Sequence, residues 1–295
     1  MSIRDELGTR MKTFYEAVPD TKLVKRMPVA IRIDGKAFHT FTQGFKRPFD
    51  EVLIKTMQQT TQYLCQNIQG CVLGYTQSDE ITLILVDYQT LTTEAWFDYR
   101  VEKLCSVPAS MATMAFNKFL NKNVVNYTFS IAGEEARYGK TEWTYEDEYL
   151  KTLMKAVDKG AIFDARCFNI PKEEVTNLIY WRQLDASCNS VQMVGQAYFS
   201  QKKLQDKSCS DIQDMLMTKG VNWNDLPIYQ KRGSCCIKIE KNITENNSVE
   251  KMKFGEDRKK TVVNIEHSHW IIDTNIPIFK GEGREYIDKL VYVGD

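Results

Sequence analysis

The sequence lacks the features of a membrane, secreted or zinc-binding protein. None of its 295 residues belongs to an apolar run of the ~20 residues that a membrane-spanning helix needs. Residues 1–6 are polar, where a signal peptide would carry positive charge and then an apolar stretch. The eight cysteines include no Cys-x-x-Cys pair, the usual signature of a zinc site or a redox couple. We therefore expect a cytoplasmic protein with reduced thiols and no membrane partner.

Net charge is absent as well. The 39 Lys and Arg residues balance 39 Asp and Glu residues, so the overall field gives no argument for nucleic-acid binding. Such a partner would have to be held by a local basic patch. The 43% hydrophobic and 26% charged content is that of a globular chain, long enough for one large or two modest domains.

The pattern of apolar residues predicts an α+β fold. The helix expected to start at Thr92 should be kinked or divided at Pro108. Residues 123–130 look like an additional strand after it. The order strand, helix, strand, strand, helix, strand is that of the ferredoxin-like βαββαβ arrangement. These elements are expected, in chain order, over residues 29–33, 48–68, 74–85 (a hairpin), 92–120 and 161–170.

The downstream half predicts further helices and a small β unit. Proline and acidic residues start a helix over residues 171–199, and Ser208 with Asp211 forms a capping-box pattern for another. Beyond Gly233, β-like runs at residues 235–240 and 261–265 predict a C-terminal antiparallel β appendage with a mobile loop between them. The expected division is a core over residues 1–135, the remainder of the core over 136–235, and the appendage over 236–295.

Two carboxylates carry the expected chemistry. In the ferredoxin-like order the first strand pairs with the hairpin at the centre of the sheet, which places Asp34 beside Asp79. Together with the backbone carbonyl of Gly35, they offer the hard oxygen ligands that suit Mg²⁺. Two such ions can clamp the attacking and leaving oxygens of a phosphoryl transfer. The alternative is that both acids are ordinary turn residues.

Several cations and hydroxyls accompany these acids. Arg100 and Lys103 are spaced to share one helix face, which is either a triphosphate grip or a solvated surface. His39 is expected to pack or hydrogen-bond, and His267 with His269 lacks a third ligand for zinc. The other groups near the acids or along that helix are Arg32, Lys36, Lys46, Arg47, Ser106 and Ser110.

The blocks Arg32-Ile-Asp-Gly-Lys-Ala-Phe-His39, Lys46-Arg-Pro-Phe-Asp50 and Gly74-Tyr-Thr-Gln-Ser-Asp-Glu80, followed by Arg100-x-x-Lys103, occur here in order. With Ser106 and Ser110, this series resembles the tRNA-His guanylyltransferase family, from about residue 8 to 235. The resemblance implies a polymerase palm-like catalytic domain that uses two Mg²⁺ ions to add nucleotides in the reverse, 3′→5′, direction. It also implies tRNA, ATP, GTP and other NTPs as substrates, and a homotetramer in which tRNA bridges subunits.

The resemblance also assigns roles to residues. Asp34, Gly35 and Asp79 would hold the metal ions, and Ser78 with Lys46 would assist activation of the RNA 5′ end. The implied nucleotide-binding residues are Gly35, Lys36, Ala37, Phe38, His39, Ser78, Arg100, Lys103, Ser106 and Ser110. The implied RNA-binding residues are Arg32, Arg182, Asn189, Lys207, Lys231 and Arg232.

One block departs from the family pattern. Members that add the extra guanylate to tRNA-His carry His-Ile-Asn-Asn after Arg-Gln-x-Asp, whereas this chain reads Asp185-Ala-Ser-Cys-Asn-Ser190. That block looks like the bacterial Thg1-like proteins, which repair 5′-truncated tRNAs by templated addition. A helix with Trp181 in the core is the simpler interpretation of this segment. Guanylate addition to tRNA-His, a nucleotidyl cyclase and a non-catalytic RNA-binding module are the competing functions.

Overall fold

The computed structural model describes residues 3–137, 148–242 and 266–293. Its centre is one antiparallel sheet with the strand order β4-β1-β3-β2-β5-β6. The strands are β1 (Val29–Gly35), β2 (Cys71–Gln77), β3 (Glu80–Leu85), β4 (Phe163–Asn169), β5 (Ser234–Asn242) and β6 (Glu266–Asp273). The α-helices are α1 (Ile3–Met11), α2 (Phe38–Phe41), α3 (Glu51–Asn67), α4 (Val101–Arg137), α5 (Glu148–Lys159), α6 (Lys172–Tyr198), α7 (Gln201–Leu204), α8 (Cys209–Met217), α9 (Ile228–Arg232) and α10 (Glu285–Val291).

The expected order of elements is confirmed by β1, α3, β2, β3, α4 and β4. Strand β1 lies between β3 and β4 and is antiparallel to both, which is the central position expected for it. The start of α3 follows from its sequence, because the Asp50 carboxylate caps the helix by accepting the Leu53 backbone N–H. The mixed helix and antiparallel-sheet architecture is therefore as expected.

Helix α4 differs from the sequence prediction in three ways. It begins at Val101 instead of Thr92, it continues through Pro108 without being divided, and it includes residues 123–130, which were expected to form a strand. The physical reason is the spacing of buried residues, since Phe116, Leu120 and Val124 continue one buried stripe at helical intervals. Four apolar and aromatic residues of this segment look strand-like by composition, but burial on one helical stripe decides their conformation.

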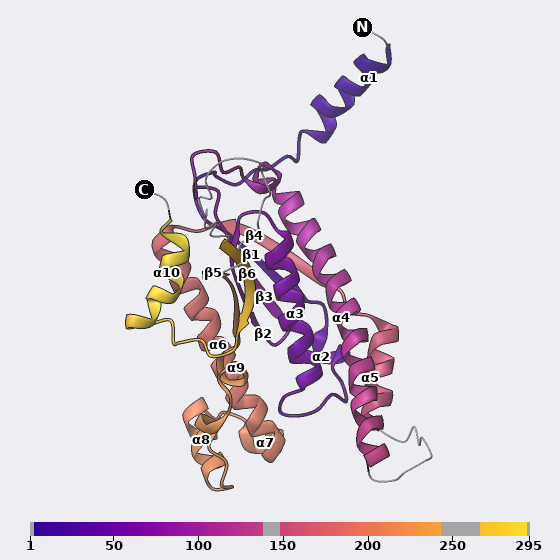
Figure 1. Ribbon diagram of the computed structural model, residues 1–295, viewed down its shortest axis with the longest axis vertical. Helices are drawn as coiled ribbons and strands as arrows, with labels where there is room; N and C mark the ends of the chain where they lie inside the picture. Colours follow the sequence, from indigo (N-terminus) through magenta and orange to yellow (C-terminus); the bar gives the residue numbers. More distant parts are fainter. Residues whose placement is uncertain (1–2, 138–147, 243–265, 294–295) are drawn as a thin grey trace, which may run out of the picture.

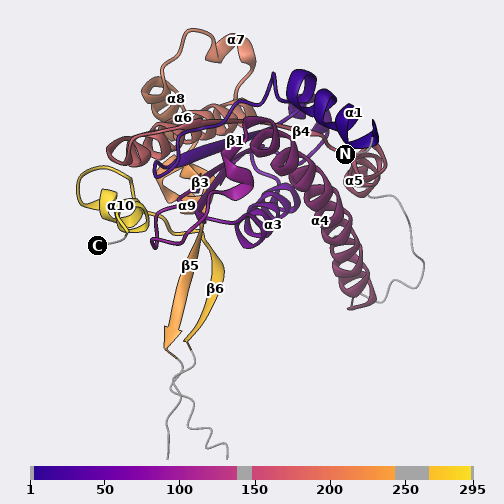
Figure 2. The same cartoon turned by 90° about the horizontal axis from the view of Figure 1, so that it is seen from above.

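The two faces of the sheet pack against different helices. Alternate residues of β1 point to opposite sides, so Ile31 and Ile33 join a core formed with α3, α4 and α5. Ala30 faces the other side, where it packs with Val175 and Ile179 of α6 and with residues of α10. Figures 1 and 2 show α3 and α4 on one side of the sheet and α6 on the other.

The α6 face changes character along β1. It is apolar at Ala30 and becomes charged at Arg32 and Asp34, which follow on the same side of the strand. The neighbouring strand β3 changes in the same direction, from Ile84 through Thr82 to Glu80. One face of the sheet thus provides a core at one end and a group of charged residues at the other.

The remaining elements extend this body. Strand β5 pairs with β2, so the β5–β6 hairpin extends the central sheet, and Figure 2 shows it projecting outward. Residues 243–265, which include the expected strand at 261–265 and most of the expected loop, lie outside the described residues. Helix α8 starts with the expected capping box of Ser208 and Asp211, and it packs with α6 around a separate small core.

The division into three domains stays a prediction. Among the described residues, no helix is long and apolar enough to cross a membrane.

Candidate active site

Asp34 and Asp79 lie side by side, as the strand order requires. Asp34 is near the end of β1, opposite Glu80 of β3 and Asp164 of β4. Asp79 follows Ser78 in the two-residue loop between β2 and β3, and its backbone carbonyl accepts a hydrogen bond of 3.1 Å from the Gly35 N–H. This hydrogen bond ties the end of β1 to the loop, so the two carboxylates belong to one rigid unit.

The environment of Asp79 opposes its negative charge. Burial raises the pKa of the Asp79 carboxyl, and the nearby Asp34 carboxylate raises it further. A hydrogen bond of 3.1 Å from the Ser78 hydroxyl acts in the opposite direction. Ser78 itself has a left-handed backbone (φ +50°), which is uncommon for a residue other than glycine. Such backbone strain is found most often at functional sites.

Asp34 is incompletely satisfied. Its Oδ2 atom lies 3.1 Å from the Arg166 guanidinium and 3.9 Å from that of Arg32, yet it is buried without a hydrogen bond of good geometry. Two close carboxylates with an unsatisfied oxygen fit a cation, which would relieve their mutual repulsion. Mg²⁺ is usually held by one or two carboxylates together with water and substrate phosphates. Asp34, Asp79 and the Gly35 carbonyl match that requirement, although the described residues contain no group of three or more acidic, His or Cys side chains suited to an ion.

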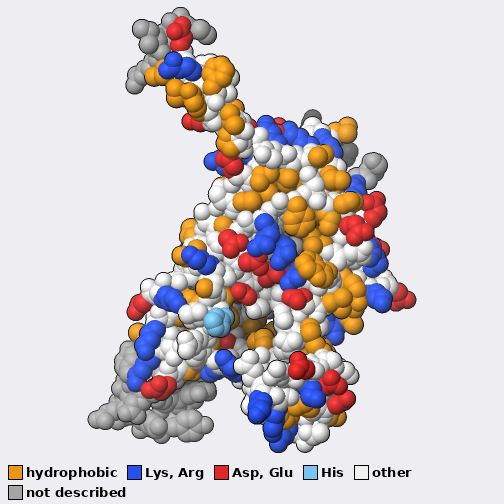
Figure 3. All heavy atoms as spheres, turned by 180° about the vertical axis from the view of Figure 1, so that it is seen from behind, with side chains coloured by type: hydrophobic (Ala, Val, Ile, Leu, Met, Phe, Trp, Pro, Cys, Tyr) orange, Lys and Arg blue, Asp and Glu red, His pale blue; other side chains and the backbone are white. Residues whose placement is uncertain are grey.

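A buried ion-pair network that sequence reasoning missed supports these acids. The Glu80 carboxylate lies 2.6 Å from the Arg182 Nε atom and 3.2 Å from Arg32. Arg182 also contacts Asp185 at 2.7 Å. Burial alone would lower the pKa of the Arg182 guanidinium, but its bonds to Glu80 and Asp185 raise it. The space-filling view in Figure 3 shows acidic and basic side chains side by side near the centre of the molecule.

The sequence contained a signal for this network. Glu80 is a charged residue inside a strand whose six residues are all buried, and such a charge requires a partner. The partner could not be inferred, because Arg182 is 102 positions away in the chain. Arg166 was missed for the same reason, since only the pairing of β4 with β1 brings it to Asp34.

The segment after β1 has both buried and exposed residues. A Cβ atom on Gly35 would lie 2.1 Å from the Phe38 ring, so the close packing of that ring requires glycine. Phe38 is buried among the rings of Phe41 and Phe116. Lys36, Ala37 and His39 are exposed beside the carboxylate pair. A nucleotide at this segment can therefore meet those three residues, while Phe38 supports the loop from within the core.

Lys46 is held by aromatic rings. Its ammonium lies 4.4 Å from the ring centroid of Tyr149 and 5.0 Å from that of Tyr127, which is the geometry of a cation–π contact. The Tyr149 hydroxyl donates to the Asp50 carboxylate at 2.7 Å, and the Lys46 backbone N–H donates to the same oxygen at 3.0 Å. Its predicted role in activation of the RNA stays a prediction.

Arg100 and Lys103 lie at the other end of the sheet from the carboxylates. The carbonyl of Val101 accepts from Cys167, and β4 pairs near that point with the first half of β1. The six residues from Val29 to Asp34 span about 17 Å. Arg100, paired with Asp20 at 3.4 Å, and Lys103 line a cleft of about 680 Å³ with Lys25 and Asp98.

Ser106 and Ser110 follow Lys103 along one exposed stripe of α4, as expected. The Ser110 hydroxyl donates to the Ser106 carbonyl at 2.8 Å. Farther along the helix, the Thr113 hydroxyl accepts the Phe163 N–H, which brings this part of α4 to the Asp34 end of the sheet. The stripe therefore connects the cleft with the region of the carboxylates.

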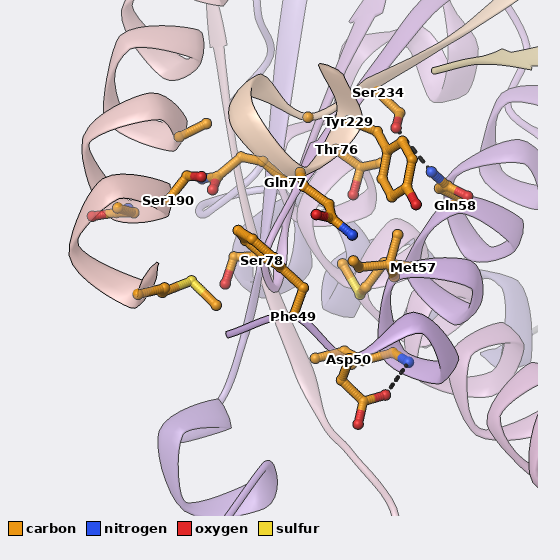
Figure 4. A pocket seen from close by; sticks show the side chains of 17 residues that line it. Phe49, Asp50, Met57, Gln58, Thr76, Gln77, Ser78, Ser190, Tyr229 and Ser234 are labelled. Atoms are coloured by element: carbon orange, nitrogen blue, oxygen red, sulfur yellow. Dashed lines mark hydrogen bonds between the residues drawn. The ribbon is translucent and has the colours of Figure 1, made fainter. Parts of the chain in front are cut away.

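A cavity of about 100 Å³ lies directly beside Ser78. Figure 4 shows side chains from the hairpin, α3, α6 and α9 around it. Its surface combines apolar side chains, such as Met57, with uncharged amide and hydroxyl groups, such as Gln77. Its Gln58 and Ser234 side chains are fixed by a mutual hydrogen bond of 2.9 Å. The Asp50 carboxylate also lines the cavity. This mixture of apolar surface and a few hydrogen-bonding groups suits a nucleobase.

The predicted RNA-binding residues have different environments. Lys231 is buried and donates to the Asn224 carbonyl, and Arg182 is buried in the Glu80 network described above. Asn189 is exposed and lines the cavity beside Ser78. Lys207 is exposed, and Arg232 is half-buried. Their RNA contacts remain predictions, and exposed Asn189 and Lys207 are the best placed to make one.

Trp181 differs from its expected place in the core. Its side chain is 52% exposed on α6, and the guanidinium carbons of Arg182 and Arg32 lie 4.4 Å and 5.5 Å from its ring centroid. The reason is that α6 turns Arg182 and Gln183 inward at this level, which leaves Trp181 and Leu184 on the outer side.

Comparison with known proteins agrees with this geometry. The model of the family described as tRNAHis guanylyltransferase (Thg1) matches residues 8–171, which is more than half of the chain. The chain belongs to the tRNA-His guanylyltransferase family. The matched region contains the carboxylate pair, the Gly35–Phe38 segment, α4 and β4, and members of this family are nucleotidyltransferases.

Individual relatives cover most of the chain. It is 26% identical to the tRNA(His) guanylyltransferase of Schizosaccharomyces pombe, over 85% of this chain and 88% of that protein. It is 29% identical to an uncharacterised protein of Acanthamoeba polyphaga mimivirus, over 84% and 81% of the two chains. A solved bacterial tRNA(His) guanylyltransferase (Thg1)-like protein in complex with ATP is 38% identical, with a TM-score of 0.72 and coverage of 98% and 100%. A bacterial Thg1-like protein in complex with GTP is 37% identical, with a TM-score of 0.69 and the same coverage.

Proposed function

We propose that this protein adds nucleotides in the 3′→5′ direction to the 5′ end of tRNA, including tRNA that has lost its first nucleotide. The observation that carries the proposal is the convergence of Asp34 and Asp79 at one end of the antiparallel sheet, which would serve as a polymerase palm-like, ferredoxin-like catalytic domain. Family membership supports the reaction class. The two solved relatives, which hold ATP and GTP, support nucleoside triphosphates as substrates.

Asp34, Asp79 and the Gly35 carbonyl would hold two Mg²⁺ ions. Bound there, the ions would supply charge stabilisation to the attacking and leaving oxygens of a phosphoryl transfer. The protein's own part is to keep the two carboxylates together through the Gly35–Asp79 hydrogen bond and to orient Asp79 through Ser78. Lys36 and His39 are exposed next to these groups and would contact the phosphates, while the cavity beside Ser78 would take a base.

The reaction proceeds in two transfers. The 5′-monophosphate of the RNA attacks the α-phosphorus of ATP and releases pyrophosphate, which leaves an adenylylated 5′ end. Lys46 and Ser78 assist this first transfer, which activates the 5′ end. In the second transfer, the 3′-hydroxyl of an incoming NTP attacks the 5′ phosphorus and releases AMP. An RNA with a 5′-triphosphate needs only the second transfer, with pyrophosphate as the leaving group.

Repair is favoured over guanylate addition to tRNA-His by two observations. The chain has Ser-Cys-Asn-Ser at residues 187–190 in place of His-Ile-Asn-Asn, and the bacterial Thg1-like structures are more similar to it than the S. pombe guanylyltransferase is. Without the His-Ile-Asn-Asn block, the opposing RNA strand would select the NTP. A homotetramer bridged by tRNA and a cytoplasmic location belong to the same proposal.

The test is addition to a tRNA transcript that lacks its first nucleotide, with all four opposing template bases. We expect the incorporated nucleotide to change with the template base and to be insensitive to the anticodon. Guanylate added whatever the template, and only to tRNA-His, would instead identify a guanylyltransferase. Labelled ATP or GTP incubated without RNA provides the check for a cyclase, which would release a cyclic nucleotide.

A further inference from the structure

The Trp181 ring on α6 is exposed and is in contact with charged neighbours. More than half of this large aromatic side chain is exposed, while its ring is in contact with two guanidinium groups. An exposed aromatic ring that is nevertheless held in place by its neighbours is a preformed contact surface.

The ring is fixed relative to the carboxylate pair. Arg32 and Arg182 both contact the ring and both pair with the buried Glu80. Arg32 also approaches the Asp34 carboxylate at 3.9 Å. A single side chain, Arg32, therefore lies between the Trp181 ring and the proposed reaction centre.

We propose that Trp181 is a stacking platform for a nucleobase of the substrate whose phosphate reacts at Asp34 and Asp79. The proposal rests on the proposed function, because it needs a nucleotide at that centre. Tryptophan stacks on any base through its π face, so it adds affinity without selecting sequence. That property suits an enzyme in which the template chooses the nucleotide.

The base has two possible sources with the same chemistry, the terminal nucleotide of the RNA and the incoming NTP. Removing an aromatic platform costs about 1–3 kcal/mol per stacked base, which corresponds to a loss of affinity of about 5- to 150-fold. The arginines that contact Trp181 also pair with Glu80, so replacing Trp181 can change the stability of the fold. The effect on ligand affinity therefore has to be distinguished from an effect on stability.

The experiment compares Trp181→Ala and Trp181→Phe with Leu184→Ala, an exposed residue of the same helix outside the cavity beside Ser78. Dissociation constants for a truncated tRNA are measured without NTP, and KM for the templated NTP is measured at saturating tRNA. We expect Trp181→Ala to weaken one of these by about 5- to 150-fold, Trp181→Phe to retain most of the affinity, and Leu184→Ala to match the wild type. Weaker tRNA binding identifies the RNA base, and a raised KM with unchanged tRNA binding identifies the NTP.

A second measurement excludes a purely structural role. An RNA with an abasic terminal residue, or a ribose triphosphate without a base, should bind wild type and Trp181→Ala equally. Loss of affinity for these base-free ligands, or equal behaviour of Trp181→Ala and wild type towards the normal ligands, would overturn the platform. Should Trp181→Ala not fold, the difference in ligand-induced fluorescence quenching between wild type and Trp181→Phe gives the same decision. These binding measurements do not depend on turnover, so an inactive wild-type enzyme would contradict the proposed function alone.

Discussion

Replacing Arg182 by methionine tests whether this arginine is structural or binds RNA. Its Nε atom lies 2.6 Å from the Glu80 carboxylate, and both side chains are only 8% exposed. Breaking a buried ion pair on one side leaves the other charge uncompensated, at a cost of about 3–5 kcal/mol. Arg32 still reaches Glu80 at 3.2 Å, which favours the lower end of that range.

We therefore expect Arg182→Met to lower the free energy of unfolding by about 3 kcal/mol. For a chain of this size, the midpoint of thermal unfolding should fall by roughly 6–12 °C. The measurement is urea and thermal unfolding followed by circular dichroism, with Arg100→Met as the control. Arg100 is 50% exposed and paired at 3.4 Å with Asp20, so its replacement should change stability little.

A double-mutant cycle with Glu80→Gln makes the test specific. Direct contact predicts that the double variant is less destabilised than the sum of the two single variants, with a coupling energy of about 0.5–3 kcal/mol. A coupling energy near zero, or an Arg182→Met variant of normal stability with weakened tRNA binding, would refute the structural role. In that outcome Arg182 would be an RNA contact, as the family resemblance implies.

Three further predictions concern the site itself. Asp79→Asn should abolish both 5′ activation and nucleotide addition. Because the pKa of Asp79 is raised, the stabilising contribution of this carboxyl is complete below the ordinary aspartate range and is lost as the pH rises through the raised value. The variant should therefore melt at a higher temperature than the wild type at neutral pH and at the same temperature in acid, and a lower melting temperature at neutral pH would contradict the burial argument. Gly35→Ala should lower stability by about 1–3 kcal/mol in denaturant unfolding, because its Cβ would lie 2.1 Å from the Phe38 ring, whereas Gly8→Ala, with open space around the new atom, should not. Lys103→Ala tests the triphosphate contact that the family resemblance implies: it should raise the KM for NTP in steady-state kinetics without changing the melting temperature, and an unchanged KM would agree with the distance of Lys103 from the carboxylates and return it to a solvated helix face.

Local signals in the sequence predicted most of the catalytic core. The alternation of β1, the hairpin flanking Asp79 and the Asp50 cap of α3 are all properties of neighbouring residues, and the strand order follows from their sequence. The position of Asp34 beside Asp79 is therefore predictable from the sequence alone. The strand expected at residues 123–130 does not form, because the buried helical stripe outweighs the β-branched and aromatic composition of this segment.

What could not be predicted depends on contacts between distant segments. Arg182 and Glu80 are charged residues that become buried only because α6 crosses the polar end of the sheet. The exposure of Trp181 is the other result of that crossing, since the arginine next to it occupies the inner side of the helix. Likewise, the distance between Lys103 and the carboxylates depends on the direction in which α4 runs against β4, which helical spacing alone does not determine.

The two-residue loop between β2 and β3 limits how this enzyme can be redesigned. Gln77 pairs directly with Glu80 across the loop, and side chains alternate between the two faces along β3. A slip of this register by one residue would exchange the faces, so that Ile81 would point to the charged side and Glu80 into the opposite core. A longer loop could therefore be grafted here only if the added residues left the pairing of Gln77 with Glu80 unchanged.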